Sequence, residues 1–360
     1  MQFISQKSDL LKGLTIASRA AASKSTQAIL TCVLFEVGEN IRITGNDTEI
    51  AIQTAVEGDI KAPGVAAVDA KFMLDMVKKL PNGDVEVETK NDTMTIKSGK
   101  TKFSVPVRDG EDFPRIPETD GGIHFTMAGY EFKDLVRQVA FAAAPSSANR
   151  VMEGINLGIK DDVLTATALD GRRIAMRSIV IGDSPDTTAI IPAKTMREIA
   201  GIVDDSDTHF YITEKFITAD FENTTVVSRL VEGTYFDIEK ILNVESGTIT
   251  KIKREALYSC VDRASILTRD SKKPIIASIT DKINIQIKSP QGSMNEDISA
   301  DVTGEEIKIG FDPAFMLDAL GAIEDSDIYI HFSNPKAPII IKDEEKTYKY
   351  VVLPVNFAED

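Results

Sequence analysis

Cysteine and histidine are scarce in this chain of 360 residues, and their scarcity narrows the chemistry that the chain can perform. The two cysteines, Cys32 and Cys260, lie far apart and fit no disulfide framework, as expected for a protein of a reducing cytoplasm. The three histidines, His124, His209 and His331, have no second histidine or cysteine at metal-ligand spacing. We therefore expect no disulfide, no metal site and no cofactor.

Long apolar runs are missing as well. The first segment, "MQFISQKSDLLKGLTIASRA", lacks the basic end and the apolar stretch of a signal peptide. No stretch approaches the roughly 18 consecutive apolar residues of a membrane span. The sequence therefore predicts a globular protein that stays in the cytoplasm.

Motifs of catalysis are incomplete. The sequence "SGKT" at 98–101 resembles the end of a phosphate-binding loop, but Met94 stands where that loop requires glycine. No nucleophile elbow G-x-S-x-G occurs. Acidic pairs such as Asp161–Asp162 are expected in solvated turns. We predict that the chain is not an enzyme and has no catalytic residues, although a hydrolase with an unrecognised carboxylate site remains an alternative.

The sequence contains one pattern three times. A strand, a helix and a strand are predicted from "VDAKFMLDMVKKLPNGDVEV" (68–87), "IPAKTMREIAGIVDDSDTHFYI" (191–212) and "IGFDPAFMLDALGAIEDSDIYI" (309–330). An amphipathic helix also opens each third of the chain, and in the first one Leu10, Leu14 and Ala17 form the apolar face. Each third is therefore two half-repeats, each with a strand, a helix and a β-meander.

Two segments separate the thirds. The sequence "RDGEDFPRIPETDGG" (108–122) is rich in proline, glycine and acidic residues, and "NVESGT" (243–248) is a weaker boundary. We predict an α+β protein of three repeated domains, 1–120, 121–245 and 246–360, each with two helices packed on antiparallel sheets.

Charge is distributed unevenly. The formal net charge is −15, yet the six predicted helices hold more lysine and arginine than acid. These helices are 8–24, 70–80, 128–144, 193–203, 251–269 and 312–322, of which the last is acidic. One explanation is that lysine and arginine are good helix formers whose side chains are simply solvated. The other is that these basic residues share one face of the molecule, which would bind a polyanion. A repeat scaffold that does not bind DNA would lack this segregation.

The motifs "FEVGENIRITGNDTEI", "TALDGRRIAM", "GFDPAFMLDAL" and "YVVLPVNF" occur in order along the chain. With the threefold repeat, they resemble the bacterial sliding clamp family, the beta subunit of DNA polymerase III. The resemblance implies the DNA clamp fold as a head-to-tail homodimeric ring, a processivity factor associated with the nucleoid. Such a ring encircles duplex DNA, slides on it without sequence preference, and tethers polymerases and the clamp loader.

The dimensions of such a ring agree with this function. Twelve helices spaced about 9–10 Å apart would surround an opening of about 26 Å, enough for a duplex of about 20 Å. The resemblance and the charge pattern assign a set of basic residues to the DNA, although an ordinary solvated role is as probable for any one of them. These are Lys12, Arg19, Lys24, Lys78, Lys79, Arg137, Arg150, Lys194, Arg197, Arg254, Arg263 and Arg269.

The resemblance also implies a pocket for apolar partner peptides. Its residues here would be Met152, Gly171, Arg172, Arg173, Ile174, Phe236, Lys240, Ile241, Asp312, Phe315, Ile339, Val351, Val352, Leu353, Pro354 and Val355. The alternative for the last five is a plain closing edge strand. This chain departs from the family pattern at Leu169, Arg172 and Asn356 and adds an acidic extension, and these departures concern the polar rim and the peptide preference of the pocket.

The dimer contact would join the first domain of one copy to the third domain of the other. By position, Phe103 and Val105 would meet Ile266 and Leu267. The alternative for these four residues is the core of their own domain.

Overall fold

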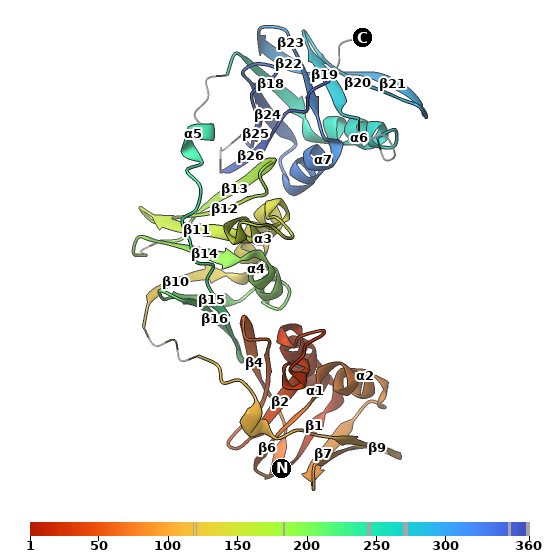
Figure 1. The fold of residues 1–360 in the computed structure, drawn as a ribbon, viewed down its shortest axis with the longest axis vertical. Coiled ribbons are helices and arrows are strands. Elements are labelled where there is room, and N and C mark those ends of the chain that lie inside the picture. The colour runs from red at the N-terminus through yellow and green to blue at the C-terminus, as the bar shows by residue number, and fades with distance from the viewer. Residues whose placement is uncertain are drawn as a thin grey trace. The chain divides into compact units, whose positions relative to one another are not determined.

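The computed structural model describes residues 1–117, 119, 121–182, 184–242, 246–268, 273–344 and 347–357, apart from the side chains of Glu239 and Lys240 (Figure 1). The described chain forms two compact units. The first unit comprises Met1–Phe132 and Arg197–Leu230, and the second comprises Lys133–Met196 and Val231–Asp360. The predicted central domain therefore contributes strands to both units.

The first unit contains two antiparallel sheets. One has the order β5-β1-β7-β8-β9 and the other the order β10-β15-β16-β17-β4-β3-β2-β6. The strands are β1 (Gln2–Gln6), β2 (Cys32–Val37), β3 (Ile41–Asn46), β4 (Ile50–Val56), β5 (Asp59–Ala62), β6 (Gly64–Asp69), β7 (Asp84–Lys90), β8 (Thr93–Ser98), β9 (Thr101–Pro106), β10 (Ile123–Ala128), β15 (Asp207–Ile212), β16 (Phe216–Phe221) and β17 (Thr224–Arg229).

Helices α1 (Lys7–Ala17) and α2 (Ala70–Lys79) pack together in the first unit. The predicted apolar face of α1 is confirmed, because Leu10, Leu14 and Ala17 are fully buried in one core cluster. Asp69 begins α2 as its N-cap, where the carboxylate accepts a hydrogen bond of 2.8 Å from the backbone N–H of Phe72. The core therefore lies between the sheets and these two helices.

The second unit has the same plan. Its larger sheet has the order β14-β11-β12-β13-β26-β25-β24-β18-β22, and its smaller sheet has the order β21-β20-β19-β23. The strands are β11 (Gly154–Lys160), β12 (Val163–Leu169), β13 (Arg173–Val180), β14 (Thr187–Pro192), β18 (Thr248–Lys253), β19 (Ile275–Ile279), β20 (Ile283–Ser289), β21 (Gly292–Ile298), β22 (Asp301–Gly304), β23 (Ile307–Phe311), β24 (Asp327–Phe332), β25 (Ile339–Lys342) and β26 (Tyr348–Val352).

Helices α6 (Arg254–Ser265) and α7 (Pro313–Ala322) pack together in this unit. Asp312 caps α7 by accepting a hydrogen bond of 2.9 Å from the N–H of Ala314, and Pro313 occupies the first helical turn, where its missing N–H costs little. The remaining helices are α3 (Gly129–Val139), α4 (Ala193–Ala200) and the short α5 (Glu239–Leu242).

The six predicted helices are all shorter in the structure, and three of them are shortened most. Helix α1 ends at Ala17 and continues as a 3₁₀ turn through Ala20, so Lys24 lies beyond it. Helix α3 ends at Val139 and α6 begins only at Arg254, after β18. The basic excess of the helices is smaller than predicted, because Arg19, Lys24, Lys251 and Lys253 lie in the flanking segments. The apolar pattern continued past the true ends because the 3₁₀ turns there still bury alanines such as Ala20 and Ala142.

Candidate partner and nucleic-acid surfaces

An apolar cluster of the second unit joins the central and C-terminal thirds of the sequence. Strand β13 pairs with β26 so that Ile174 lies opposite Val351, and Val351 lies opposite Ile340 on β25. These side chains are buried together with Leu169 and Ile238. Met152 and Tyr235 pack against the cluster from outside and remain partly exposed. The structure thus brings together Met152, Ile174 and Val351 as the resemblance implied.

The chain beyond β26 runs across both sheets of the second unit. The N–H of Leu353 donates to the carbonyl of Arg172 at 2.9 Å, and the N–H of Val355 donates to the carbonyl of Gly310 at 2.8 Å. Pro354 lies between them and has no N–H to donate. The tail residues 353–357 therefore bridge the turn before β13 and strand β23, and we call this segment the C-terminal tail.

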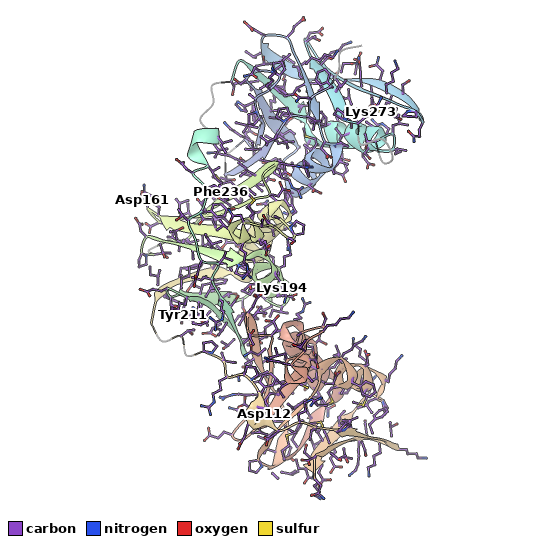
Figure 2. The ribbon with its side chains drawn as sticks, viewed as in Figure 1. Asp112, Asp161, Lys194, Tyr211, Phe236 and Lys273 are labelled. Atoms are coloured by element: carbon purple, nitrogen blue, oxygen red, sulfur yellow. The ribbon has the colours of Figure 1, made fainter. Side chains whose placement is uncertain are left out.

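Four apolar side chains in the chain segments that adjoin this cluster are exposed to solvent. Phe236 lies in the segment that leads to α5 (Figure 2) and is 39% exposed. Ile241 of α5 is 37% exposed. In the C-terminal tail, Leu353 is 40% and Val355 is 37% exposed. Large apolar side chains exposed next to an apolar cluster are typical of a surface that binds a partner.

Arg173 fixes the polar side of this region. Its Nε donates to Asp170 at 2.9 Å, one terminal nitrogen donates to the carbonyl of Phe141 at 2.7 Å, and the other pairs with Asp318. The guanidinium also lies 4.6 Å from the ring centre of Phe315. Burial acts to lower the pKa of Arg173, but Tyr350 and Asp318 outweigh it, so the pKa is raised above its ordinary value. Arg173 is therefore a fixed cation at this site.

Other residues of the predicted pocket have supporting positions. Val351 and Val352 are fully buried, because β26 is an internal strand rather than a lip. Ile339 faces the opposite side of the sheet and lines a core cavity of about 20 Å³. Asp312 is engaged as the cap of α7. The side chain of Lys240 lies outside the described residues.

The turn before β13 presents the remaining two residues. Gly171 has a φ of +84°, a left-handed conformation that favours glycine, and Arg172 beside it is exposed. The Asp170 carboxylate accepts hydrogen bonds from the N–H groups of Arg172 and Arg173 at 2.9 and 3.1 Å. This turn holds the Arg172 carbonyl where the C-terminal tail attaches.

The predicted DNA-facing residues are on the surface. All are exposed except Arg254, which is half-buried, and Arg269, which lies outside the described residues. Several form ion pairs that the sequence did not reveal, because each partner is remote in sequence. These pairs are Lys12–Glu222 at 3.3 Å, Arg19–Glu198 at 2.9 Å, Arg137–Glu324 at 2.6 Å and Arg263–Glu296 at 3.1 Å.

A groove of about 430 Å³ lies beside α1 in the first unit. It is lined by Lys12 and Arg19 together with Leu11, Ile16 and Gly201. The sequence did not predict it, because Gly201 and Ile202 approach α1 only through the paired strands β17 and β4. The groove places two predicted DNA-facing residues at one depression.

The residues predicted for the dimer contact differ in exposure. Ile266 is 61% exposed just after α6, and Leu267 is half-buried. Phe103 is half-buried on the edge strand β9, whereas Val105 is 7% exposed and packs in the core cluster of the first unit. Any contribution of Val105 to a dimer would therefore come from the backbone of the edge strand.

The fold and these surfaces define an α+β protein of the clamp class, built from antiparallel sheets with few helices. Family models of the DNA polymerase III beta subunit match this chain along almost its whole length: the N-terminal domain at 1–117, the central domain at 126–237 and the C-terminal domain at 239–356. The chain belongs to the DNA polymerase III beta subunit family.

Individual relatives agree with this assignment. The beta sliding clamp of Bacillus subtilis is 30% identical, with 99% of each chain covered. Its crystal structure gives a TM-score of 0.95 at 29% identity, covering 99% of this chain and 100% of that one. A sliding clamp of Pseudomonas aeruginosa solved with bound griselimycin is 25% identical over the same shares, with a TM-score of 0.94. Within the described residues, no helix has both the length and the apolar character of a membrane span.

Proposed function

We propose that this protein is the processivity factor of a replicative DNA polymerase: a closed homodimeric ring that encircles duplex DNA, slides on it and tethers polymerases and the clamp loader. The observation that carries the proposal is the match of all three family models, in order, over almost the whole chain. The alternatives, a hydrolase with a carboxylate site and a scaffold that does not bind DNA, gain no support from this match.

The proposed mechanism is topological. A ring that surrounds DNA stays on it without gripping it, so contacts need only be weak and independent of sequence. Exposed lysine and arginine side chains directed at phosphates provide such contacts. The protein would act in the cytoplasm, on the DNA of the nucleoid.

Retention on DNA of different topology tests this function. The protein is loaded by its clamp loader onto nicked circular DNA, and half of the sample is then linearised with a restriction enzyme. A closed ring stays on the circle and slides off the linear ends, so retention should fall on linearisation. Equal retention on both forms would refute the encircling ring.

The proposed partner site is the surface around the apolar cluster, which we name the tail pocket: Met152, Ile174, Phe236, Ile241, Phe315, Leu353 and Val355. Burying one leucine or phenylalanine anchor contributes on the order of 1.5–3 kcal/mol. A few anchors, less the cost of ordering the peptide, correspond to a dissociation constant of about 1 μM. Polymerase-derived peptides with apolar anchors should bind here and should compete with one another.

A further inference from the structure

Four ion pairs join a predicted DNA-facing cation to a carboxylate that is remote in sequence, whereas Arg254 pairs with its neighbour Glu255 and Arg137 pairs additionally with Asp134. The pairs Lys12–Glu222, Arg19–Glu198, Arg137–Glu324 and Arg263–Glu296 are named here the four pairs. Each joins two different elements, so the carboxylate is brought to the cation by tertiary structure rather than by helical spacing. Lys12 and Arg19 lie at the same groove, so two of the four pairs meet there.

The four pairs are accessible to a competing anion. The side chain of Lys12 is 70% exposed and that of Arg263 is 52% exposed, while Arg19 and Arg137 are 37% and 40% exposed. Exposed ion pairs of this kind change an equilibrium constant by roughly 1.4- to 5-fold. A phosphate that replaces the carboxylate therefore exchanges one weak contact for another.

We propose that the glutamates of the four pairs compete with DNA phosphates for these cations and thereby keep each DNA contact weak and short-lived. The inference rests on the proposed function, because it concerns cations that face DNA. The four glutamates are therefore positioning residues: they act on sliding through the cations that they hold. They are Glu198, Glu222, Glu296 and Glu324. When the contact between the cation and a phosphate breaks, the carboxylate pairs with the cation again. The cation is therefore never left without a partner, and the energy barrier for sliding to the next position on DNA stays low.

The pairs should differ in strength. Arg263 donates to Glu296 through two nitrogens, Nε and a terminal nitrogen, which is the geometry of a strong guanidinium–carboxylate pair. Lys12 holds Glu222 through a single contact of 3.3 Å between two exposed side chains. Glu296 therefore restrains its cation most and Glu222 least. Within the described chain, Lys24, Lys78 and Lys79 have no ion pair, so these three lysines reach phosphates without competition.

The test compares two variants with the same change of charge. The first carries Glu198→Gln, Glu222→Gln, Glu296→Gln and Glu324→Gln. The control carries Asp59→Asn, Glu86→Gln, Glu88→Gln and Asp297→Asn, which removes four carboxylates that pair with lysines outside the predicted DNA-facing set. Binding to a fluorescent linear duplex is measured over a series of salt concentrations, and the diffusion of loaded rings is tracked on single DNA molecules.

The first variant should bind the duplex about 10-fold more tightly than the wild type, because several pairs of roughly 1.4- to 5-fold each are released. Its binding should also depend more steeply on salt, by about 0.9 in the log–log slope for each added phosphate contact. Its diffusion along DNA should slow. The control should remain within about 2-fold of the wild type. If both variants gained the same affinity for DNA, the change in net charge alone would explain the effect, and the proposal would be overturned.

A double-mutant cycle isolates one pair. Glu198→Gln should strengthen DNA binding in the wild type but leave it unchanged in an Arg19→Ala background, because the cation that the carboxylate restrains is then gone. The same gain in both backgrounds would overturn the proposal. A wild-type protein that is not retained on circular DNA would instead refute the proposed function itself, and the inference with it.

Discussion

At the scale of single residues, the turn "LDGRR" determines how the central third of the chain meets the C-terminal third. Leu169 is one of the positions at which the sequence departs from the pattern that the resemblance implies, and its side chain is 6% exposed inside the apolar cluster. Arg172 is exposed and contributes its carbonyl, whereas Arg173 contributes its side chain. The departure at Leu169 therefore extends the core and leaves the polar contacts to Arg173.

Arg173→Lys should destabilise the second unit. A lysine cannot reproduce the contacts of the guanidinium with two aspartates, the Phe141 carbonyl and the Phe315 ring, and it would leave partly buried acceptors without donors. The free energy of unfolding should fall by about 1–3 kcal/mol. Urea unfolding measures it, with Arg172→Lys as the matched control. Equal stabilities of the two variants would contradict this role.

At the scale of elements, the C-terminal tail is attached to the fold by two backbone hydrogen bonds and by the half-buried Phe357, whose ring lies 5.6 Å from the Lys308 ammonium, while Leu353 and Val355 stay exposed. Deleting Leu353–Asp360 should abolish binding of a polymerase-derived peptide, because it removes the exposed Leu353 and Val355. The dimer should persist. Deleting Ala358–Asp360 alone, as the control, should leave binding unchanged. Fluorescence anisotropy with a labelled peptide measures both. Undiminished binding after the longer deletion would move the peptide site elsewhere.

Adding a single methyl group at Gly310 tests whether peptide binding depends on how the C-terminal tail is attached. A Cβ at position 310 would lie 2.5 Å from the carbonyl oxygen of Val355, too close for the tail to stay in place. Gly310→Ala should therefore weaken peptide binding by roughly 2- to 10-fold, the equivalent of one backbone hydrogen bond. Gly38→Ala, where a Cβ would meet nothing within 4 Å, is the control in the same assay. Unchanged binding in Gly310→Ala would show that the tail position is unimportant.

Periodicity predicted the elements well but not the pairing between them. The alternation of "DVEV" and the helical spacing of Leu10 and Leu14 predicted a strand and a helix, because burial of one face leaves a repeat in the sequence. The bonds of Arg173 to Phe141 and Asp318 have no such repeat. They depend on side chains that only the folded chain brings within reach. For the same reason the resemblance located Val351 at the site but could not reveal that an internal strand buries it.

At the scale of the whole molecule, the proposed dimer depends on exposed apolar surface after α6. Ile266→Ala with Leu267→Ala removes side chains whose burial in a dimer would each contribute on the order of 1.5–3 kcal/mol. The dimer should therefore dissociate at higher protein concentration, as measured by sedimentation. Ile249→Ala removes a comparable exposed isoleucine on β18 and should not change the mass. A double variant that stays dimeric on dilution would place the contact elsewhere.

The large sheets also limit which fragments of this chain can fold without exposing the edge of a strand. Strand β17 pairs with β4, with Val226 opposite Ile52, and β13 pairs with β26. A fragment of residues 121–245 would expose the backbone edges of both β17 and β13, and open edges of this kind recruit strands from other molecules. The threefold repeat in the sequence is therefore not a set of autonomous folding units. An isolated central third should aggregate unless its neighbours are supplied, because a fragment covers both of these edges only if it includes β4 and β26.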